Sequence, residues 1–163
     1  MQREVFASSN TCEWETPQDF FDRWNEQYHF DLDVCATHEN AKCSRYFTKE
    51  QNGLEEEWKG NCWMNPPYGK EIREWMRKAY ESMMEGATVV CLVPARTDTA
   101  WWHEYAMKDK ITFIRGRMKF GGQKNSAPFP SAIVVFEGSG GKKDVQDVPH
   151  QPWRGWPDAG DHA

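Results

Sequence analysis

Hydrophobic residues recur at helical spacing in two segments of this 163-residue chain, and each segment predicts an amphipathic helix. The first apolar set is Phe20, Phe21, Trp24 and Tyr28, and the second is Ile72, Trp75, Met76, Ala79 and Met83. Thr16-Pro17 precedes the first helix and supplies a hydroxyl cap followed by proline at the first helical position. A third helix is predicted from Thr99 to about Met107.

Short apolar runs between these helices predict the strands of a sheet. The stretch "HFDLDVCA" (29–36) alternates apolar and acidic residues, whereas "NCWM" (61–64) and "ATVVCLV" (87–93) are continuous and typical of buried strands. "KITFI" (110–114) and "SAIVVF" (131–136) are predicted to form an antiparallel edge pair. Residues 37–59 are polar and predicted to be irregular. Helices alternating with strands predict an α/β fold with a mostly parallel sheet.

Length and composition indicate one domain. Residues 1–137 carry the periodic pattern, and residues 138–163 are rich in Gly, Pro, Lys and Asp, which predicts a poorly ordered tail. No apolar run approaches the roughly 18 residues of a membrane span, and the first residues do not resemble a signal peptide. We therefore expect a cytoplasmic protein with no membrane partner; its oligomeric state is not indicated, and a monomer is the default.

Cysteine content and charge narrow the chemistry. Five cysteines without a C-x-x-C pair argue against a disulfide framework and against a metal site. The net charge of −5 argues against non-specific binding of polyanions by the whole surface. Residues 108–124 nevertheless hold six basic residues against one acid, Asp109. This segment predicts a localised contact with phosphates, or alternatively a solvated charged face.

The stretch Asn65-Pro66-Pro67-Tyr68 follows the predicted strand 61–64 directly. Two consecutive prolines cannot continue a helix or a paired central strand, because neither donates a backbone N–H. Ligands in open α/β sheets bind beyond the carboxyl ends of strands, so this stretch is predicted to lie at the functional edge. A proline-rich turn that merely closes the strand is the alternative.

These four residues suit chemistry on an exocyclic amino group. Such a nitrogen is a weak nucleophile because its lone pair is delocalised into the ring. Two acceptors, the side-chain oxygen of Asn65 and the carbonyl of Pro66, would receive both amino hydrogens and favour a pyramidal nitrogen. The proline rings keep that carbonyl in place, and Tyr68 offers a flat face for a base that has left the duplex. Asn65 has no titratable group, so we expect acceptors and proximity to an electrophile to drive the reaction.

The wider pattern resembles the phage-type DNA N6-adenine methyltransferases (the phage Dam family) over roughly residues 11–137. Seven segments carry the resemblance in order: "WETP" (14–17), "FDLDVCA" (30–36), "NAKCSRYFT" (40–48), "LEEEWKGNCWMNPPYG" (54–69), "LVPARTDTAWWH" (92–103), "GRMKF" (116–120) and "APFPSAIVVF" (127–136). The resemblance implies a single-domain, Rossmann-like fold that uses S-adenosylmethionine and acts on double-stranded DNA, in the host cytoplasm if the chain is phage-encoded.

Site roles follow from the resemblance. It implies catalytic roles for Asn65, Pro66, Pro67 and Tyr68. Cofactor contacts are implied for Trp14, Thr16, Pro17, Asp33, Cys35, Ala36 and Asn65, although Thr16-Pro17 alone would equally serve as a helix cap. No Gly-x-Gly follows Asp33, where many methyltransferases have one. The basic residues Arg96, Arg115, Arg117 and Lys119 are the expected DNA contacts.

The four-residue motif leaves other substrates open. It also occurs in enzymes that methylate cytosine N4 in DNA, a guanine amino group in RNA or a glutamine amide in protein. A non-catalytic nucleic-acid-binding module on the same fold is a further alternative. The full-length resemblance favours transfer to adenine N6 in DNA after the base is flipped out of the duplex.

Overall fold

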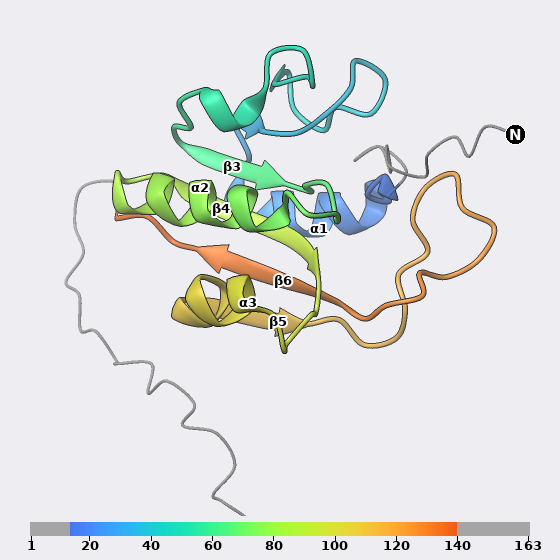
Figure 1. The fold of residues 1–163 in the computed structure, drawn as a ribbon. Helices are drawn as coiled ribbons and strands as arrows, with labels where there is room; N and C mark the ends of the chain where they lie inside the picture. Colours follow the sequence, from blue (N-terminus) through green and yellow to red (C-terminus); the bar gives the residue numbers. More distant parts are fainter. Residues whose placement is uncertain (1–13, 140–163) are drawn as a thin grey trace, which may run out of the picture.

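A six-stranded sheet with the order β2-β1-β3-β4-β6-β5 forms the centre of the computed structural model, which describes residues 14–139 (Figure 1). The first four strands pair in parallel, and β6 pairs antiparallel with both β4 and β5. The strands are β1 (Leu32–Asp33), β2 (Arg45–Tyr46), β3 (Asn61–Met64), β4 (Thr88–Pro94), β5 (Lys110–Phe113) and β6 (Ser131–Phe136). This arrangement confirms the predicted α/β fold and its antiparallel edge pair.

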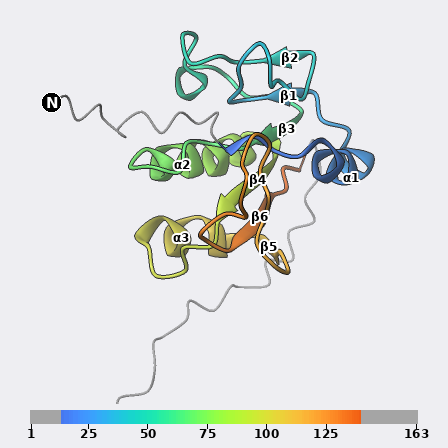
Figure 2. The same ribbon diagram turned by 90° about the vertical axis from the view of Figure 1, so that its right-hand side faces the viewer.

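Helices cover the two faces of the sheet unequally. Figure 2 shows α1 (Gln18–Tyr28) on one face, with α2 (Ile72–Met84) and α3 (Ala100–Glu104) on the other. Short 3-10 turns at Gly53–Glu55 and Ala106–Lys108 complete the described elements. No helix within residues 14–139 is long and apolar enough to cross a membrane.

The core lies where these layers meet. Every residue of β4 and β6 is buried, as expected for strands covered on both faces. On the α1 face, the ring of Phe21 meets Trp63 of β3 edge-on, with 5.3 Å between the ring centroids. On the other face, the five residues of α2 that the periodicity singled out are all buried. Trp58 stacks on Trp75 of α2 and anchors the irregular segment before β3 to the core.

Two strand predictions need correction. The first strand is only Leu32–Asp33, paired with β2 on one side and β3 on the other, and the side chain of Asp33 is buried. Residues 45–46, predicted to be irregular, form β2. Two residues are too few to show a periodic signal, so parallel pairing with β1 defines this strand.

The predicted helix cap is also wrong. Pro17 occupies the N-cap position of α1 without any capping side chain, and the hydroxyl of Thr16 instead accepts a hydrogen bond from Asn65. The third helix ends at Glu104, and a 3-10 turn covers the rest of its predicted length. The predicted tail 138–163 lies outside the described residues except for positions 138 and 139.

Replacing Gly53 with alanine tests this packing. A Cβ atom at Gly53 would lie 2.2 Å from the backbone oxygen of Val34, which cannot move without displacing the end of β1. We expect Gly53→Ala to lower the free energy of unfolding by about 1–3 kcal/mol in chemical denaturation. Gly69→Ala is the matched control, because a Cβ there has no atom within 4 Å. Equal stability of the two variants would contradict the described packing.

Candidate active site around Asn65

The site forms at the carboxyl edge of the parallel strands. Asn65 directly follows β3, and Asp33 is the last residue of the neighbouring strand β1. Parallel strands end at the same edge, so a polar side chain from each strand reaches one region. Asn65 is 7% exposed, which means that its amide must find partners within the protein.

Hydrogen bonds fix the orientation of the Asn65 amide. Its nitrogen Nδ2 donates to the carbonyl of Trp14 at 2.6 Å and to the hydroxyl of Thr16 at 3.1 Å. Its oxygen Oδ1 accepts from the hydroxyl of Tyr68 at 2.6 Å. A carboxamide has two donor hydrogens and two acceptor lone pairs, so three of the four positions are used within the protein. The position that remains is an acceptor.

Tyr68 also helps to hold this arrangement. Its hydroxyl lies 2.6 Å from Asn65 Oδ1 and 3.2 Å from the carbonyl oxygen of Leu92 in β4. Burial raises the pKa of Tyr68 well above its ordinary value, so the phenol stays neutral and keeps its proton. Arg96 donates from Nη1 to the backbone carbonyl of Tyr68 at 2.8 Å and thereby fixes the loop itself.

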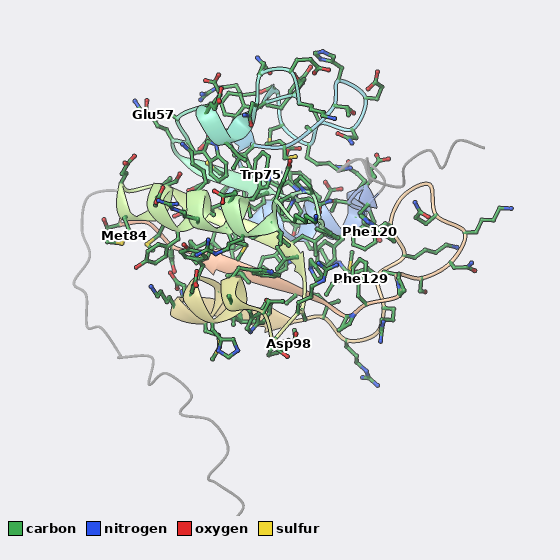
Figure 3. All side chains as sticks on the ribbon, viewed as in Figure 1. Glu57, Trp75, Met84, Asp98, Phe120 and Phe129 are labelled. Carbon is green, nitrogen blue, oxygen red and sulfur yellow. The ribbon has the colours of Figure 1, made fainter. Side chains whose placement is uncertain are left out.

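Four aromatic rings pack against one another, and two of them belong to Trp14 and Tyr68, which bond the amide. Trp14 and Tyr68 lie nearly parallel, with an interplanar angle of 15° and 6.4 Å between their centroids. Phe129 meets these two rings edge-on at 5.1 and 5.5 Å, and Phe120 also contacts both. In Figure 3 the side chains of Phe120 and Phe129 lie next to one another. The expected open face of Tyr68 is therefore covered, and we name these rings the aromatic cover.

The aromatic cover joins two distant segments. Phe120 and Phe129 belong to the β5–β6 connection, residues 114–130, whereas Trp14 precedes α1. The backbone N–H of Gly121 donates to the carbonyl of Glu15 at 2.8 Å and pairs the two segments directly. Phe120 and Phe129 lie in two of the segments that resemble the phage Dam family, but neither phenylalanine had a predicted role. Only the tertiary structure shows that this connection folds back against Trp14 and Tyr68, the residues that bond Asn65.

A small polar cavity of about 20 Å³ lies beside the amide. Four of the residues predicted to contact a cofactor line it together: Thr16, Asp33, Cys35 and Asn65. The sequence analysis missed four further lining residues, Glu15, Asn40, Lys42 and Trp63. Pro17 and Ala36 flank these positions without lining the cavity, and the ring of Trp14 belongs to the aromatic cover.

Asp33 provides a buried carboxyl group in this cavity. It accepts hydrogen bonds from the backbone N–H groups of Lys42 at 3.0 Å and Cys35 at 3.3 Å. Among residues 14–139 it forms no ion pair, and burial raises its pKa to about 7. A cationic or hydroxyl-bearing ligand would stabilise the carboxylate form, so the site suits such a group.

The predicted basic contacts fall into two groups. Arg115, Arg117 and Lys119 are exposed on the same connection that carries Phe120. Arg96 is half-buried and supports Tyr68, so one of its N–H groups already has a partner. DNA contacts at these four positions stay predictions. Within the described part of the chain, no three His, Cys, Asp or Glu side chains are grouped so that they could hold a metal ion.

The sequence of this chain is similar to those of known proteins. The family model described as DNA N-6-adenine-methyltransferase (Dam) matches residues 6–144. A protein named DNA N-6-adenine-methyltransferase from Haemophilus phage HP1 (strain HP1c1) is 34% identical over 137 residues, covering 76% of this chain and 78% of that protein. A protein of the same name from Escherichia phage T1 is 34% identical over 94 residues, covering 56% of this chain and 39% of that protein.

The raised pKa of Asp33 predicts a pH-dependent contribution to stability. An unfolded Asp titrates near 3.9, whereas the folded value is about 7. The folded state therefore binds the proton more tightly, and stability falls as the pH rises from about 4 to 7, by up to about 4 kcal/mol. Denaturation of the wild type and of Asp33→Asn across this range isolates the effect. The wild type should lose stability relative to the variant as the pH rises, and parallel curves would contradict the burial of this carboxyl.

Proposed function

Because this chain belongs to the DNA N-6-adenine-methyltransferase family, we propose that it transfers the methyl group of S-adenosylmethionine to the N6 amino group of adenine in double-stranded DNA. This proposal rests on the hydrogen bonds of the Asn65 amide. Its two donors and one of its lone pairs are used within the protein, which leaves one acceptor for a substrate N–H.

A fixed acceptor at this position favours reaction at an amino group. The amino nitrogen of adenine has two hydrogens, and Asn65 Oδ1 would accept one of them. The carbonyl of the buried Pro66 is the predicted acceptor for the second. When both hydrogens are held in this way, the nitrogen lone pair points away from the ring plane and toward the electrophile. Because Asn65 Oδ1 is oriented by its hydrogen bonds before the substrate arrives, this acceptor needs little reorganisation during methyl transfer.

The substrate proton needs no base among these residues. An amide does not titrate, and burial keeps the pKa of Tyr68 high, so its phenol does not ionise to accept a proton. Loss of the proton to water after transfer agrees with both properties. The main contributions of Asn65 and Tyr68 are therefore orientation and electrostatic stabilisation.

The target base can reach this acceptor only outside the duplex, since its amino group is otherwise paired and stacked. The aromatic cover includes Trp14 and Tyr68, which both bond Asn65 and whose rings are nearly parallel. Planar rings of this kind stack readily on a flipped base. Entry of a base requires Trp14, Phe120 or Phe129 to move outward, and the connection that carries both phenylalanines also carries the predicted basic contacts.

The polar cavity is the proposed S-adenosylmethionine site. When bound, this cofactor supplies an electrophilic methyl group next to a positively charged sulfur. The buried carboxyl of Asp33 and the hydroxyl of Thr16 suit its charged and polar groups. A cavity of about 20 Å³ holds roughly one water molecule, so the segment 14–16 or the 34–42 loop must move to admit a nucleoside-sized ligand.

The substrate class is tested by nucleoside analysis. The protein is incubated with labelled S-adenosylmethionine and, separately, with duplex DNA, RNA and a protein extract, and the products are digested and analysed by mass spectrometry. N6-methyladenine from DNA is the expected product. Label found only as N4-methylcytosine, in RNA or in protein would replace the proposed substrate with one of those alternatives. DNA binding without any transfer would favour the non-catalytic reading.

Asn65→Ala tests the acceptor. Loss of a single preorganised polar group in an active site costs about 100- to 1,000-fold in kcat, and we expect a loss of this size. Cofactor affinity, measured by calorimetry, should change only severalfold. Asn61→Ala is the matched control, because Asn61 lies at the opposite end of β3 and donates to the carbonyl of Tyr28. Near-normal turnover of Asn65→Ala would refute the acceptor role.

Tyr68→Phe tests the positioning of Asn65. The variant keeps the ring in the aromatic cover but removes the O–H that holds Asn65 Oδ1. Loss of one hydrogen bond predicts a fall in kcat of about tenfold with little change in KM. Tyr80→Phe is the control, since Tyr80 belongs to α2 and its ring packs against Tyr105 and Phe136. An unchanged kcat would show that the tyrosine hydroxyl does not orient the amide.

A further inference from the structure

An open groove of about 510 Å³ runs between α1 and the end of the edge strand β5. Its α1 side is a single helical stripe, and its β5 side is the start of the β5–β6 connection. The lining residues are Phe20, Arg23, Trp24 and Gln27 from α1, and Phe113, Ile114 and Arg115 from the other side. Figure 2 shows why this space is available, because α1 is the single helix on its face of the described sheet.

The groove has the composition of a nucleic-acid contact. Two guanidinium groups and one amide stand among aromatic and aliphatic walls, and no acidic residue lines it. The acids of α1, Asp19, Asp22 and Glu26, fall outside the stripe at 100° per residue. Among residues 14–139, neither Arg23 nor Arg115 takes part in an ion pair. The two cations are therefore available to an anionic partner, on a chain whose net charge is −5.

The groove and the candidate active site are built from the same two segments of the chain. Arg115 lies near the start of the β5–β6 connection, which also carries Phe120 and Phe129. At the other end, Thr16 bonds to Asn65 directly before α1 begins. Arg23 lies five residues after Gln18, the first residue of α1, which corresponds to about 7.5 Å along the helix axis.

We propose that this groove binds the sugar-phosphate backbone of DNA next to the target adenine, with Arg23 and Arg115 on phosphates. This inference rests on the proposed function and extends the DNA contact from the β5–β6 connection to α1. The aromatic and aliphatic walls of Phe20, Trp24 and Ile114 pack against the sugars. Arginine suits phosphate because its planar fork donates two parallel hydrogen bonds. A contact of this type adds affinity without sequence preference.

Arg23→Ala provides the test, with the full-length chain and a DNA duplex that the wild type methylates. Arg77→Ala is the matched control, because Arg77 is also exposed but lies on α2, on the opposite face of the sheet, where it pairs with Glu81. We expect Arg23→Ala to weaken DNA binding about tenfold. The negative slope of log K against log salt concentration should become shallower by about 0.9, because one phosphate contact is lost. Arg77→Ala should leave both quantities at their wild-type values.

The outcomes separate this inference from the proposed function. An unchanged affinity and salt slope in Arg23→Ala, while the wild type methylates DNA, would overturn the groove assignment alone. A loss confined to particular flanking sequences would also overturn it, because that result indicates base reading. If Arg23→Ala changes the sedimentation coefficient of the protein but leaves its DNA affinity unchanged, the groove is assigned to contact with a second copy of the chain. If the wild type neither binds nor methylates DNA, the proposed function itself fails.

Discussion

The hydrogen-bonded amide of Asn65 is the interaction on which the rest of the site depends. It joins the end of β3 to residues 14–16 through its nitrogen, and to Tyr68 through its oxygen. Tyr68 in turn contacts the carbonyl of Leu92 in β4. Three segments that are distant in sequence are therefore linked by the carboxamide and by its partner Tyr68, and a buried amide with three partners has a fixed orientation. The unused lone pair acquires a defined direction as a result.

The segment 14–16 couples the two spaces that flank this amide. Glu15 and Thr16 line the polar cavity, whereas the ring of Trp14 belongs to the aromatic cover. Glu15 also pairs with Gly121 in the β5–β6 connection. A movement of segment 14–16 that widens the cavity therefore also shifts Trp14 in the aromatic cover. The described structure is closed at both places, since the cavity is small and Tyr68 is buried under the other rings.

Much of this fold could be predicted because its strongest signals are local. Helical spacing predicted α1 and α2, and continuous apolar runs predicted β3, β4 and β6. Each of these elements buries one or both of its faces, so its apolar residues follow a regular pattern. The strand Arg45–Tyr46 could not be predicted, because two residues carry no period. Asp33 was expected in an alternating strand, yet it is buried and bonded by the loop that follows β1, whose path no local pattern encodes. The hydroxyl of Thr16 was predicted to cap α1 or to contact a cofactor. In the structure it accepts a hydrogen bond from Asn65 and does not cap the helix.

The site was predictable in part for the same reason. The position of Asn65 followed from proline chemistry and from the strand before it, and the grouping of Thr16, Asp33 and Cys35 beside it followed from the family resemblance. The roles of Phe120 and Phe129 depend on a long connection that returns to the active edge, and no local pattern encodes that path. The same holds for the groove, whose two walls are almost 90 residues apart in sequence.

The most direct test of the acceptor model is a crystal structure of the protein with S-adenosylhomocysteine and a duplex that contains its mapped target adenine. The model predicts a flipped adenine whose N6 lies within about 3.2 Å of Asn65 Oδ1, while the amide nitrogen still contacts the 14–16 segment. An adenine whose N6 faces Nδ2, or a bound base beyond hydrogen-bonding reach of Asn65, would contradict it.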